Sequence, residues 1–412
     1  MIKFALMGHG VVGSGVAEVF FEHKEAYEKK VGDELELKYI LDLRDFPNLP
    51  YSNLFTKDFD DIINDDEIKI VVEVMGGVGA AYNFVKQCLQ KGKSVATSNK
   101  ELVAKHGAEL IKIATENNCN FLFEASVGGG IPIIRPLYQC LTANNILEIN
   151  GILNGTTNYI LTKMIKEQVA FDDALKTAQE LGYAERDPSA DVNGDDACRK
   201  ICILSSLAYG KHVYPDWVYT EGITKITLDD VDYAADFDCV IKLIGRAAMG
   251  DDGKLQVSVY PALISKNSQL STVDDVFNAV LVRGDAVGDT VFYGRGAGKM
   301  PTASAVVADV LDCAKHLNRR RTINWDDCTD SSYVKPIGQT NAKVYARVKA
   351  DNVDAVKSAV ENAFGNVKFL CRENAQNEVA FVTERMVEKD IDSKLSSLGV
   401  EVLSKIRVLD EI

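Results

Sequence analysis

The stretch IKFALMGHGVVGSGVAEVF, residues 2 to 20, decides the fold of the first part of this chain. Residues 2 to 7 form a short apolar run typical of a buried strand, and the loop Gly8-His-Gly10-Val-Val-Gly13 follows it directly. A helical pattern then runs from about Val12 to Lys29. A glycine loop between a strand and a helix is typical of a dinucleotide-binding fold.

Each glycine of this loop has a physical role in such a fold. Gly8 permits the tight turn, Gly10 lets the backbone approach a pyrophosphate, and Gly13 allows the helix to pack closely against the strand. The backbone N–H groups at the helix start, at Val11 and Val12, would face the anion. The loop therefore predicts an oxidoreductase that binds NAD or NADP.

The second predicted strand, LKYIL, ends at Asp42, where a carboxylate would accept hydrogen bonds from a ribose. Arg44 beside it would instead hold the 2′-phosphate of NADP. These two residues leave both coenzymes open.

Further strand and helix patterns alternate up to the strand FLFEAS near residue 126, which predicts a parallel, doubly wound sheet. We expect a dinucleotide-binding domain at 1–130, rejoined by a strand, turn and helix at about 291–318. An α+β domain for substrate binding and dimerisation is expected at 131–290, and a polar linker at 319–340. Residues 341–412 have the βαββαβ order of a ferredoxin-like module. The predicted class is α/β.

Charge and composition exclude two classes of partner. The formal net charge of -14 over 412 residues argues against binding to nucleic acid or to anionic lipid. No apolar run approaches the roughly 20 residues that cross a bilayer. The nine cysteines are scattered and odd in number, which favours reduced thiols. A cytoplasmic enzyme with a small-molecule substrate is expected.

The densest polar cluster is GYAERDPSADVNGDDACRK, residues 182 to 200. Its acidic residues crowd ahead of an otherwise apolar helix, which predicts that they are buried. Asp196 and Lys200 are four residues apart and so lie on one helix face. A lysine among apolar neighbours is a plausible proton donor or acceptor, whereas spacing alone favours an ordinary surface ion pair.

Several motifs together resemble homoserine dehydrogenase over nearly the full length. They are VATSNKELVA, FEASVGGGIPII, GILNGTTNYILTKM, GYAERDPSADVNGDDACRK and YGRGAGKMPTASAVVADV, in the order of that family. The resemblance implies interconversion of L-homoserine and L-aspartate 4-semialdehyde with NAD or NADP, on the route to threonine, methionine and isoleucine. It also implies a homodimer or homotetramer.

The resemblance also implies residue roles. Lys200 would be the acid/base, Asp196 would hold the substrate amine and position that lysine, and Lys100 would assist at the junction of nicotinamide and substrate. The other implied substrate-binding residues are Glu185, Gly155, Thr156, Tyr183 and Asp191. Gly298 would close over the cofactor.

In FEASVGGGIPI, the resemblance implies a sodium ion bound by Glu124 and by the carbonyls of Val127, Gly129 and Ile131. Carboxylate and carbonyl oxygens suit such a hard cation. From the residues alone, a buried turn with a hydrogen-bonded glutamate is the alternative.

The C-terminal module resembles an ACT domain, the ligand-sensing fold often joined to amino-acid enzymes. Its first loop, residues 350–354, reads Ala-Asp-Asn-Val-Asp and lacks the usual Pro and Gly of that family's ligand loop. A threonine effector and a role in assembly therefore both remain open. A non-catalytic nucleotide sensor is the rival hypothesis from another class, against which the lysines at 100 and 200 argue.

Overall fold

The computed structural model describes residues 1–323, 325–373 and 375–409, and it divides into two compact units. Unit 1 comprises residues 1–146, 202–215 and 292–329. Unit 2 comprises 147–201, 216–291 and the chain from Asp330 onward. Helix α8 (Asp195–Tyr209) and strand β12 (Gly288–Arg295) each begin in unit 2 and end in unit 1.

Unit 1 is built on a six-stranded sheet in the order β3-β2-β1-β4-β5-β6, with parallel neighbours throughout. The strands are β1 (Ile2–Met7), β2 (Leu35–Leu41), β3 (Phe55–Thr56), β4 (Ile68–Glu73), β5 (Ser94–Thr97) and β6 (Phe121–Leu122). The order reverses between β1 and β4, where doubly wound sheets bind ligands at the carboxyl ends of the strands. The predicted parallel, doubly wound sheet is confirmed, and the short β3 is an addition that the sequence pattern did not predict.

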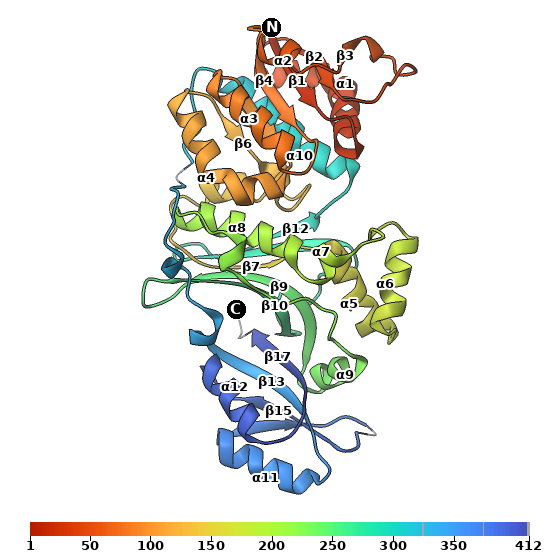
Figure 1. The fold of residues 1–412 in the computed structure, drawn as a ribbon, viewed down its shortest axis with the longest axis vertical. Coiled ribbons are helices and arrows are strands. Elements are labelled where there is room, and N and C mark those ends of the chain that lie inside the picture. Colours follow the sequence, from red (N-terminus) through yellow and green to blue (C-terminus); the bar gives the residue numbers. More distant parts are fainter. Residues whose placement is uncertain (324, 374, 410–412) are drawn as a thin grey trace. The chain divides into compact units, whose positions relative to one another are not determined.

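Among the described residues, the α-helices that lie wholly in this unit are α1 (Val11–Val31), α2 (Asp60–Ile63), α3 (Gly79–Gln90), α4 (Lys100–Glu116) and α10 (Lys299–Lys315). Figure 1 shows α10, which is distant in sequence, among the N-terminal strands and helices. It packs so closely on α1 that a Cβ on Gly15 would lie 3.1 Å from the Cβ of Ala303. The glycine is therefore required for this helix contact.

The division of the chain differs from the expected domain boundaries at two internal segments. Residues 131–146 and 202–215 fall in unit 1, as does the first half of the predicted linker, residues 319–329. The buried His212 explains the second segment, because its Nε2 lies 2.9 Å from the carbonyl oxygen of Ala104 and its Nδ1 accepts a hydrogen bond from Trp325 Nε1. Trp325 is itself buried, so this part of the predicted linker is packed rather than solvated.

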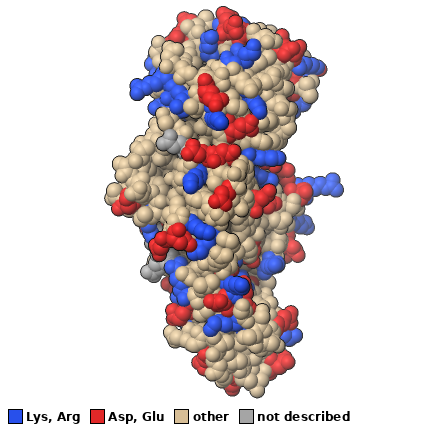
Figure 2. Space-filling model, turned by 60° about the vertical axis from the view of Figure 1, so that its left-hand side comes forward, with Lys and Arg blue, Asp and Glu red and all other residues tan. Residues whose placement is uncertain are grey.

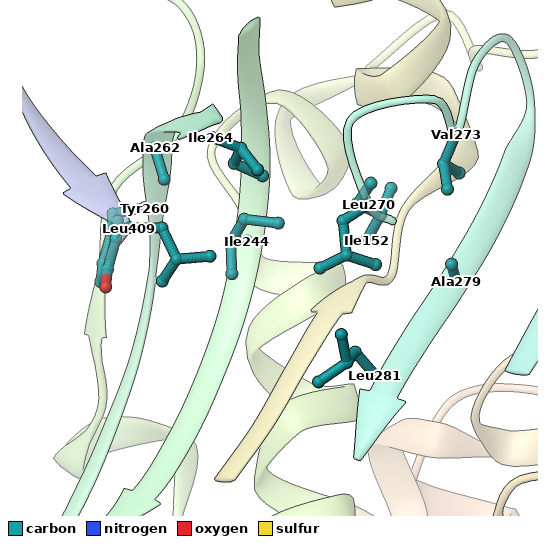
Figure 3. Close-up of a cluster of buried hydrophobic side chains, with 10 residues drawn as sticks. All are labelled: Ile152, Ile244, Tyr260, Ala262, Ile264, Leu270, Val273, Ala279, Leu281 and Leu409. Atoms are coloured by element: carbon teal, nitrogen blue, oxygen red, sulfur yellow. The ribbon is translucent and has the colours of Figure 1, made fainter. Parts of the chain in front are cut away.

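Unit 2 contains most of an eleven-stranded mixed sheet, whose main path runs β12-β11-β7-β9-β10-β17-β13-β15-β14. Its first strands are β7 (Ile146–Ile152), β9 (Cys239–Met249), β10 (Leu255–Ser265) and β11 (Phe277–Gly284), and β8 (Tyr219–Thr220) pairs with β10 off this path. The helices α5 (Gly155–Glu167), α6 (Phe171–Glu180), α7 (Ser189–Val192) and α9 (Leu228–Asp236) complete this part. Side chains from four neighbouring strands, among them Ile152, Ile244, Tyr260 and Leu281, meet in one buried apolar cluster (Figure 3).

The C-terminal residues continue the same sheet. In chain order the elements are β13 (Asn341–Lys349), α11 (Val353–Phe364), β14 (Val367–Leu370), β15 (Glu378–Thr383), β16 (Met386–Val387), α12 (Glu388–Ser397) and β17 (Val402–Leu409). These elements keep the expected βαββαβ order, with the two-residue strand β16 added between β15 and α12. Val360 of α11 and Ile391 of α12 share one apolar cluster with Phe381 of β15, so both helices cover one face of these strands. Strand β17 pairs with β10 in parallel and with β13 antiparallel, which joins this module to the rest of unit 2.

On the face drawn in Figure 2, the Lys and Arg side chains of the described residues are interspersed with Asp and Glu. None of the described helices is both long enough and apolar enough to span a bilayer.

Candidate active site

The glycine loop in unit 1 has the geometry that its sequence predicts. Gly8 has a φ of +99°, and a Cβ on Gly13 would lie 2.0 Å from the carbonyl oxygen of Gly8. Gly10 precedes α1, and a Cβ placed there would meet no atom within 4 Å. Because Val11 and Val12 open the helix, their backbone N–H groups belong to its positive end. Space over Gly10 beside this helix start is what a bound pyrophosphate requires.

Asp42 follows β2 at the same edge of the sheet, and its carboxylate is held from two sides. It accepts hydrogen bonds from the backbone N–H of His9 at 2.8 Å and from Arg44, whose Nη2 lies 2.8 Å from Oδ2. The hydrogen bond from Arg44 keeps the pKa of Asp42 well below its usual value. The Arg44 side chain is 62% exposed, so the structure presents a guanidinium beside the glycine loop.

Sequence reasoning missed a buried carboxylate, Glu73, which is the last residue of β4. Strand β4 pairs with β1, the strand that precedes the glycine loop. Glu73 accepts hydrogen bonds from the hydroxyl of Thr97 at 2.6 Å and from the backbone N–H of Met75 at 2.9 Å. Burial raises the pKa of Glu73. Asn99 contacts Thr97 and caps α4, whose first residue is Lys100. The available sequence signal was one acidic residue inside the apolar run IKIVVEV.

The loop from Glu124 to Ile131 was predicted to bind a cation. The Glu124 carboxylate accepts backbone hydrogen bonds from Ile133, Ile134 and Arg135 at 2.7 to 2.8 Å. Among the described residues, we find no hydrogen bond to the carbonyl oxygens of Val127, Gly129 or Ile131, which are all buried. The described part of the chain holds no cluster of three or more His, Cys, Asp or Glu suited to a metal ion.

This loop lies against the turn that carries Gly298. A Cβ on Gly129 would lie 2.5 Å from the carbonyl oxygen of Gly296, and the N–H of Gly130 donates to the carbonyl of Arg295 at 3.1 Å. Gly298 has a φ of +123° and precedes the first turn of α10. The predicted cation loop and the predicted cofactor-closing turn are therefore neighbours in unit 1.

In unit 2, Lys200 and Asp196 form a buried ion pair on α8. The Lys200 ammonium donates to Asp196 Oδ2 and to the carbonyl of Leu153, each at 2.7 Å. The two residues are 7% and 4% exposed, which excludes the surface ion pair that spacing alone favoured. The hydrogen bonds fix the ammonium at the start of the helix, between α8 and the end of β7.

Asn154, which sequence reasoning did not single out, connects this pair to a second carboxylate. Its Nδ2 donates to Asp191 Oδ1 at 2.7 Å and to Asp196 Oδ2 at 2.9 Å, while its Oδ1 caps α5 at Thr157. Two carboxylates are thus held around one amide next to a lysine. The signal was an Asn immediately ahead of a helix, in the motif GILNGTTNY.

Two further predicted substrate residues, Gly155 and Thr156, directly follow Asn154 in unit 2. Gly155 opens α5, where a Cβ would lie 2.8 Å from the carbonyl of Val276. The Thr156 hydroxyl donates to the carbonyl of Tyr183 at 2.7 Å, which ties α5 to the 181–188 loop.

The expected burial of the acidic cluster is wrong for three of its members. Glu185, Asp187 and Asp195 are exposed, as is the side chain of Tyr183 at 44%. A carboxylate with no opposite charge to compensate it stays hydrated, because burying an uncompensated charge is costly. Asp196 is buried only because Lys200 and Asn154 compensate its charge.

Comparisons with known proteins agree with this geometry. A family model described as "Homoserine dehydrogenase" matches residues 132–311, and one described as "Homoserine dehydrogenase, NAD binding domain" matches residues 8–124. A homoserine dehydrogenase of Bacillus subtilis is 42% identical over 83% of this chain and 78% of its own length. One of Synechocystis is 39% identical over 99% of each chain.

Solved structures give the same result. A homoserine dehydrogenase from Thiobacillus denitrificans has a TM-score of 0.88 and 35% identity, covering 99% of this chain and 98% of its own. A hyperthermophilic archaeal homoserine dehydrogenase in complex with NADPH has a TM-score of 0.64 and 29% identity, covering 76% of this chain and 97% of its own.

Proposed function

This chain belongs to the homoserine dehydrogenase family of oxidoreductases, and from that premise we propose that it interconverts L-homoserine and L-aspartate 4-semialdehyde, with Lys200 as the acid/base. The observation that carries the proposal is the buried ion pair of Lys200 and Asp196, joined to Asp191 by Asn154. Such a step would serve threonine, methionine and isoleucine biosynthesis.

The proposed chemistry needs a proton at the oxygen of the reacting carbon. The nicotinamide, when bound, supplies or accepts the hydride. During reduction the Lys200 ammonium stabilises the developing alkoxide and gives it a proton, and during oxidation the lysine takes that proton back. Asp196 and the carbonyl of Leu153 hold the ammonium in place. We also assign an assisting role to Lys100, at the start of α4.

The substrate amine is positively charged, and carboxylates are the groups that recognise it. We assign it to Asp196 and to Asp191, whose positions Asn154 fixes. Glu185 lies exposed on the 181–188 loop, and we propose that its carboxylate also binds the substrate. Tyr183, Thr156 and Gly155 would form the wall of the pocket on that side.

The glycine loop and α1 would hold the coenzyme pyrophosphate, and Gly298 would approach it from the start of α10. We propose that the protein uses NADP or NAD as its coenzyme. In support, the exposed guanidinium of Arg44 suits bidentate contact with a 2′-phosphate. The Asp42 carboxylate would accept hydrogen bonds from a ribose of NAD when Arg44 turns away.

For sodium, we propose that the Glu124 carboxylate and the carbonyls of Val127, Gly129 and Ile131 are the ligands. The three N–H groups on the Glu124 carboxylate support a role for that residue in shaping the loop beside the ion. Melting temperatures in sodium chloride and in choline chloride at equal ionic strength test this. A bound cation raises the temperature in sodium only, because it stabilises the folded state by mass action.

We propose that residues 341–412 form an ACT-like module that serves either threonine sensing or assembly, within a homodimer or homotetramer. Light scattering at several concentrations measures the oligomeric state. Activity with and without millimolar threonine decides between the two roles.

The central experiment is steady-state oxidation of L-homoserine with NAD and NADP side by side. We expect turnover with at least one of them. A chain that binds nucleotide yet oxidises no homoserine contradicts the proposal and favours a sensor. Faster turnover of an analogue without the amino group indicates a dehydrogenase for another hydroxy acid.

A further inference from the structure

Residues Tyr219 to Asp230, here called the bridge segment, pack against residues 192–194, which immediately precede the helix that carries Lys200. A Cβ on Gly222 would lie 2.0 Å from the carbonyl oxygen of Val192, and the N–H of Ile223 donates to that same oxygen at 2.9 Å. A Cβ on Gly194 would lie 3.1 Å from the side chain of Thr220. Residues 192–194, which separate Asp191 from α8, therefore have no room to move toward the bridge segment.

The first end of the bridge segment is held by a buried arginine of the C-terminal strand β17. Arg407 is 3% exposed, and its Nη1 lies 2.9 Å from Glu221 Oε2. The carbon of its guanidinium also lies over the rings of Tyr219 and Tyr260, at 4.7 and 4.8 Å from their centroids. Its other nitrogens bind both oxygens of Glu388 on α12. One side chain thus connects the bridge segment to the C-terminal module.

The second end of the bridge segment is held by β13. Arg347 Nη2 donates to the hydroxyl of Thr227 at 3.1 Å, and its Nε donates to Asp230 at 3.2 Å. Tyr345 donates its hydroxyl hydrogen to Asp230 at 3.0 Å. Arg347, Tyr345 and Asp230 are all buried. Buried side chains of the C-terminal module therefore hold the bridge segment at two separate places, one on each side of the residues that contact 192–194.

We propose that the C-terminal module positions the proton-transfer site through the bridge segment, with Glu221 and Arg407 as the positioning pair. The inference rests on the roles proposed above for Asp191, Asp196 and Lys200, which flank or follow residues 192–194. When the Glu221 link is lost, the bridge segment loosens, and the start of α8 loses its support. Rates depend steeply on the placement of such groups.

The test compares Glu221→Ala with a matched control, Lys405→Met. Lys405 lies on β17 and also pairs with Glu388, yet among the described residues it has no hydrogen bond or ion pair with the bridge segment. We expect Glu221→Ala to lower kcat/KM for homoserine at least about fivefold while the nucleotide Kd changes less than twofold. Lys405→Met should leave both unchanged. Glu221→Gln keeps an acceptor oxygen for Arg407 and should restore most of the activity.

Hydrogen exchange gives a readout that does not depend on the substrate. We expect faster exchange of the amides of residues 192–201 in Glu221→Ala than in Lys405→Met. If Glu221→Ala does not fold, Arg407→Lys tests the same link, because lysine reaches fewer of these carboxylate oxygens. Wild-type exchange and wild-type kcat/KM in a folded variant overturn the proposal. If the wild-type protein does not oxidise homoserine, the proposed function is wrong. The positioning proposal is then still tested by comparing hydrogen exchange in the two variants.

Discussion

Replacing Lys200 by methionine separates the chemical role of its ammonium from its structural role. Methionine keeps most of the side-chain volume and removes the two hydrogen bonds, to Asp196 and to the carbonyl of Leu153, each 2.7 Å long. General acid/base catalysis typically contributes a factor of about 10² to 10⁴. At about 1.4 kcal/mol per factor of ten, the barrier should rise by about 3 to 6 kcal/mol.

The same substitution leaves the Asp196 carboxylate buried without its ammonium. Asp196 is 4% exposed, and breaking a buried ion pair from one side costs about 3 to 5 kcal/mol. That is a large part of the typical stability of about 5 to 15 kcal/mol, so Lys200→Met should also melt earlier.

The double variant Asp196→Asn with Lys200→Met removes both charges and resolves the two effects. Replacing a buried ion pair by neutral groups of similar volume is often neutral for stability. We therefore expect the double variant to regain most of the lost melting temperature and to remain at least about a hundredfold slower than wild type.

The assays are steady-state oxidation of homoserine, thermal melting, and nucleotide binding by fluorescence. Nucleotide Kd should stay near the wild-type value in both variants, because the glycine loop belongs to unit 1. Turnover of Lys200→Met within tenfold of wild type, or recovery of turnover in the double variant, would refute the acid/base role.

Three further predictions concern other residues of the site and of unit 1. Arg44→Ala should raise the KM for NADP about tenfold or more and leave the KM for NAD nearly unchanged, because only NADP carries the 2′-phosphate; equal effects on both KM values contradict this. Asn154→Ala should cost about 1 kcal/mol in denaturant unfolding through loss of the α5 cap, and it should raise the KM for homoserine because Asp191 and Asp196 lose their common donor. His212 should make stability pH-dependent, since burial lowers its pKa from 6.5 and Trp325 donates to its Nδ1, so the folded state favours the neutral ring. The neutral His212 ring contributes fully to the free energy of unfolding above pH 6.5, and this contribution is lost as the pH falls toward the pKa of His212 in the folded state. Tryptophan-monitored unfolding at pH 5 and pH 8 should show a smaller difference in the free energy of unfolding for His212→Gln than for the wild type.

The local part of the candidate site could be predicted because neighbouring residues determine it. The spacing of Gly8, Gly10 and Gly13 placed a turn and a helix start, and these appear with a φ of +99° at Gly8 and α1 beginning at Val11. The four-residue spacing of Asp196 and Lys200 placed them on one helix face. Such features depend on backbone sterics and helix periodicity within one or two turns.

The same neighbouring residues did not predict which side chains on this helix face are buried. Asp195 and Asp196 are adjacent in the sequence, yet one is exposed and the other is 4% exposed. The difference comes from Asn154, 42 positions away, whose amide reaches Asp196 once β7 and α5 bring it beside α8. No local pattern carries this information, which is why Glu185 was expected to be buried and is exposed.

By itself, the sequence determined the alternation of strands and helices, the glycine loop and the helix face shared by Lys200 and Asp196, because each follows from the conformational preferences of adjacent residues. Only the tertiary structure decided which carboxylates are buried, that β17 pairs with β10, and that Arg407 reaches Glu221, 186 positions away. The physical reason is that desolvation and charge compensation act between groups that become neighbours only when the chain has folded.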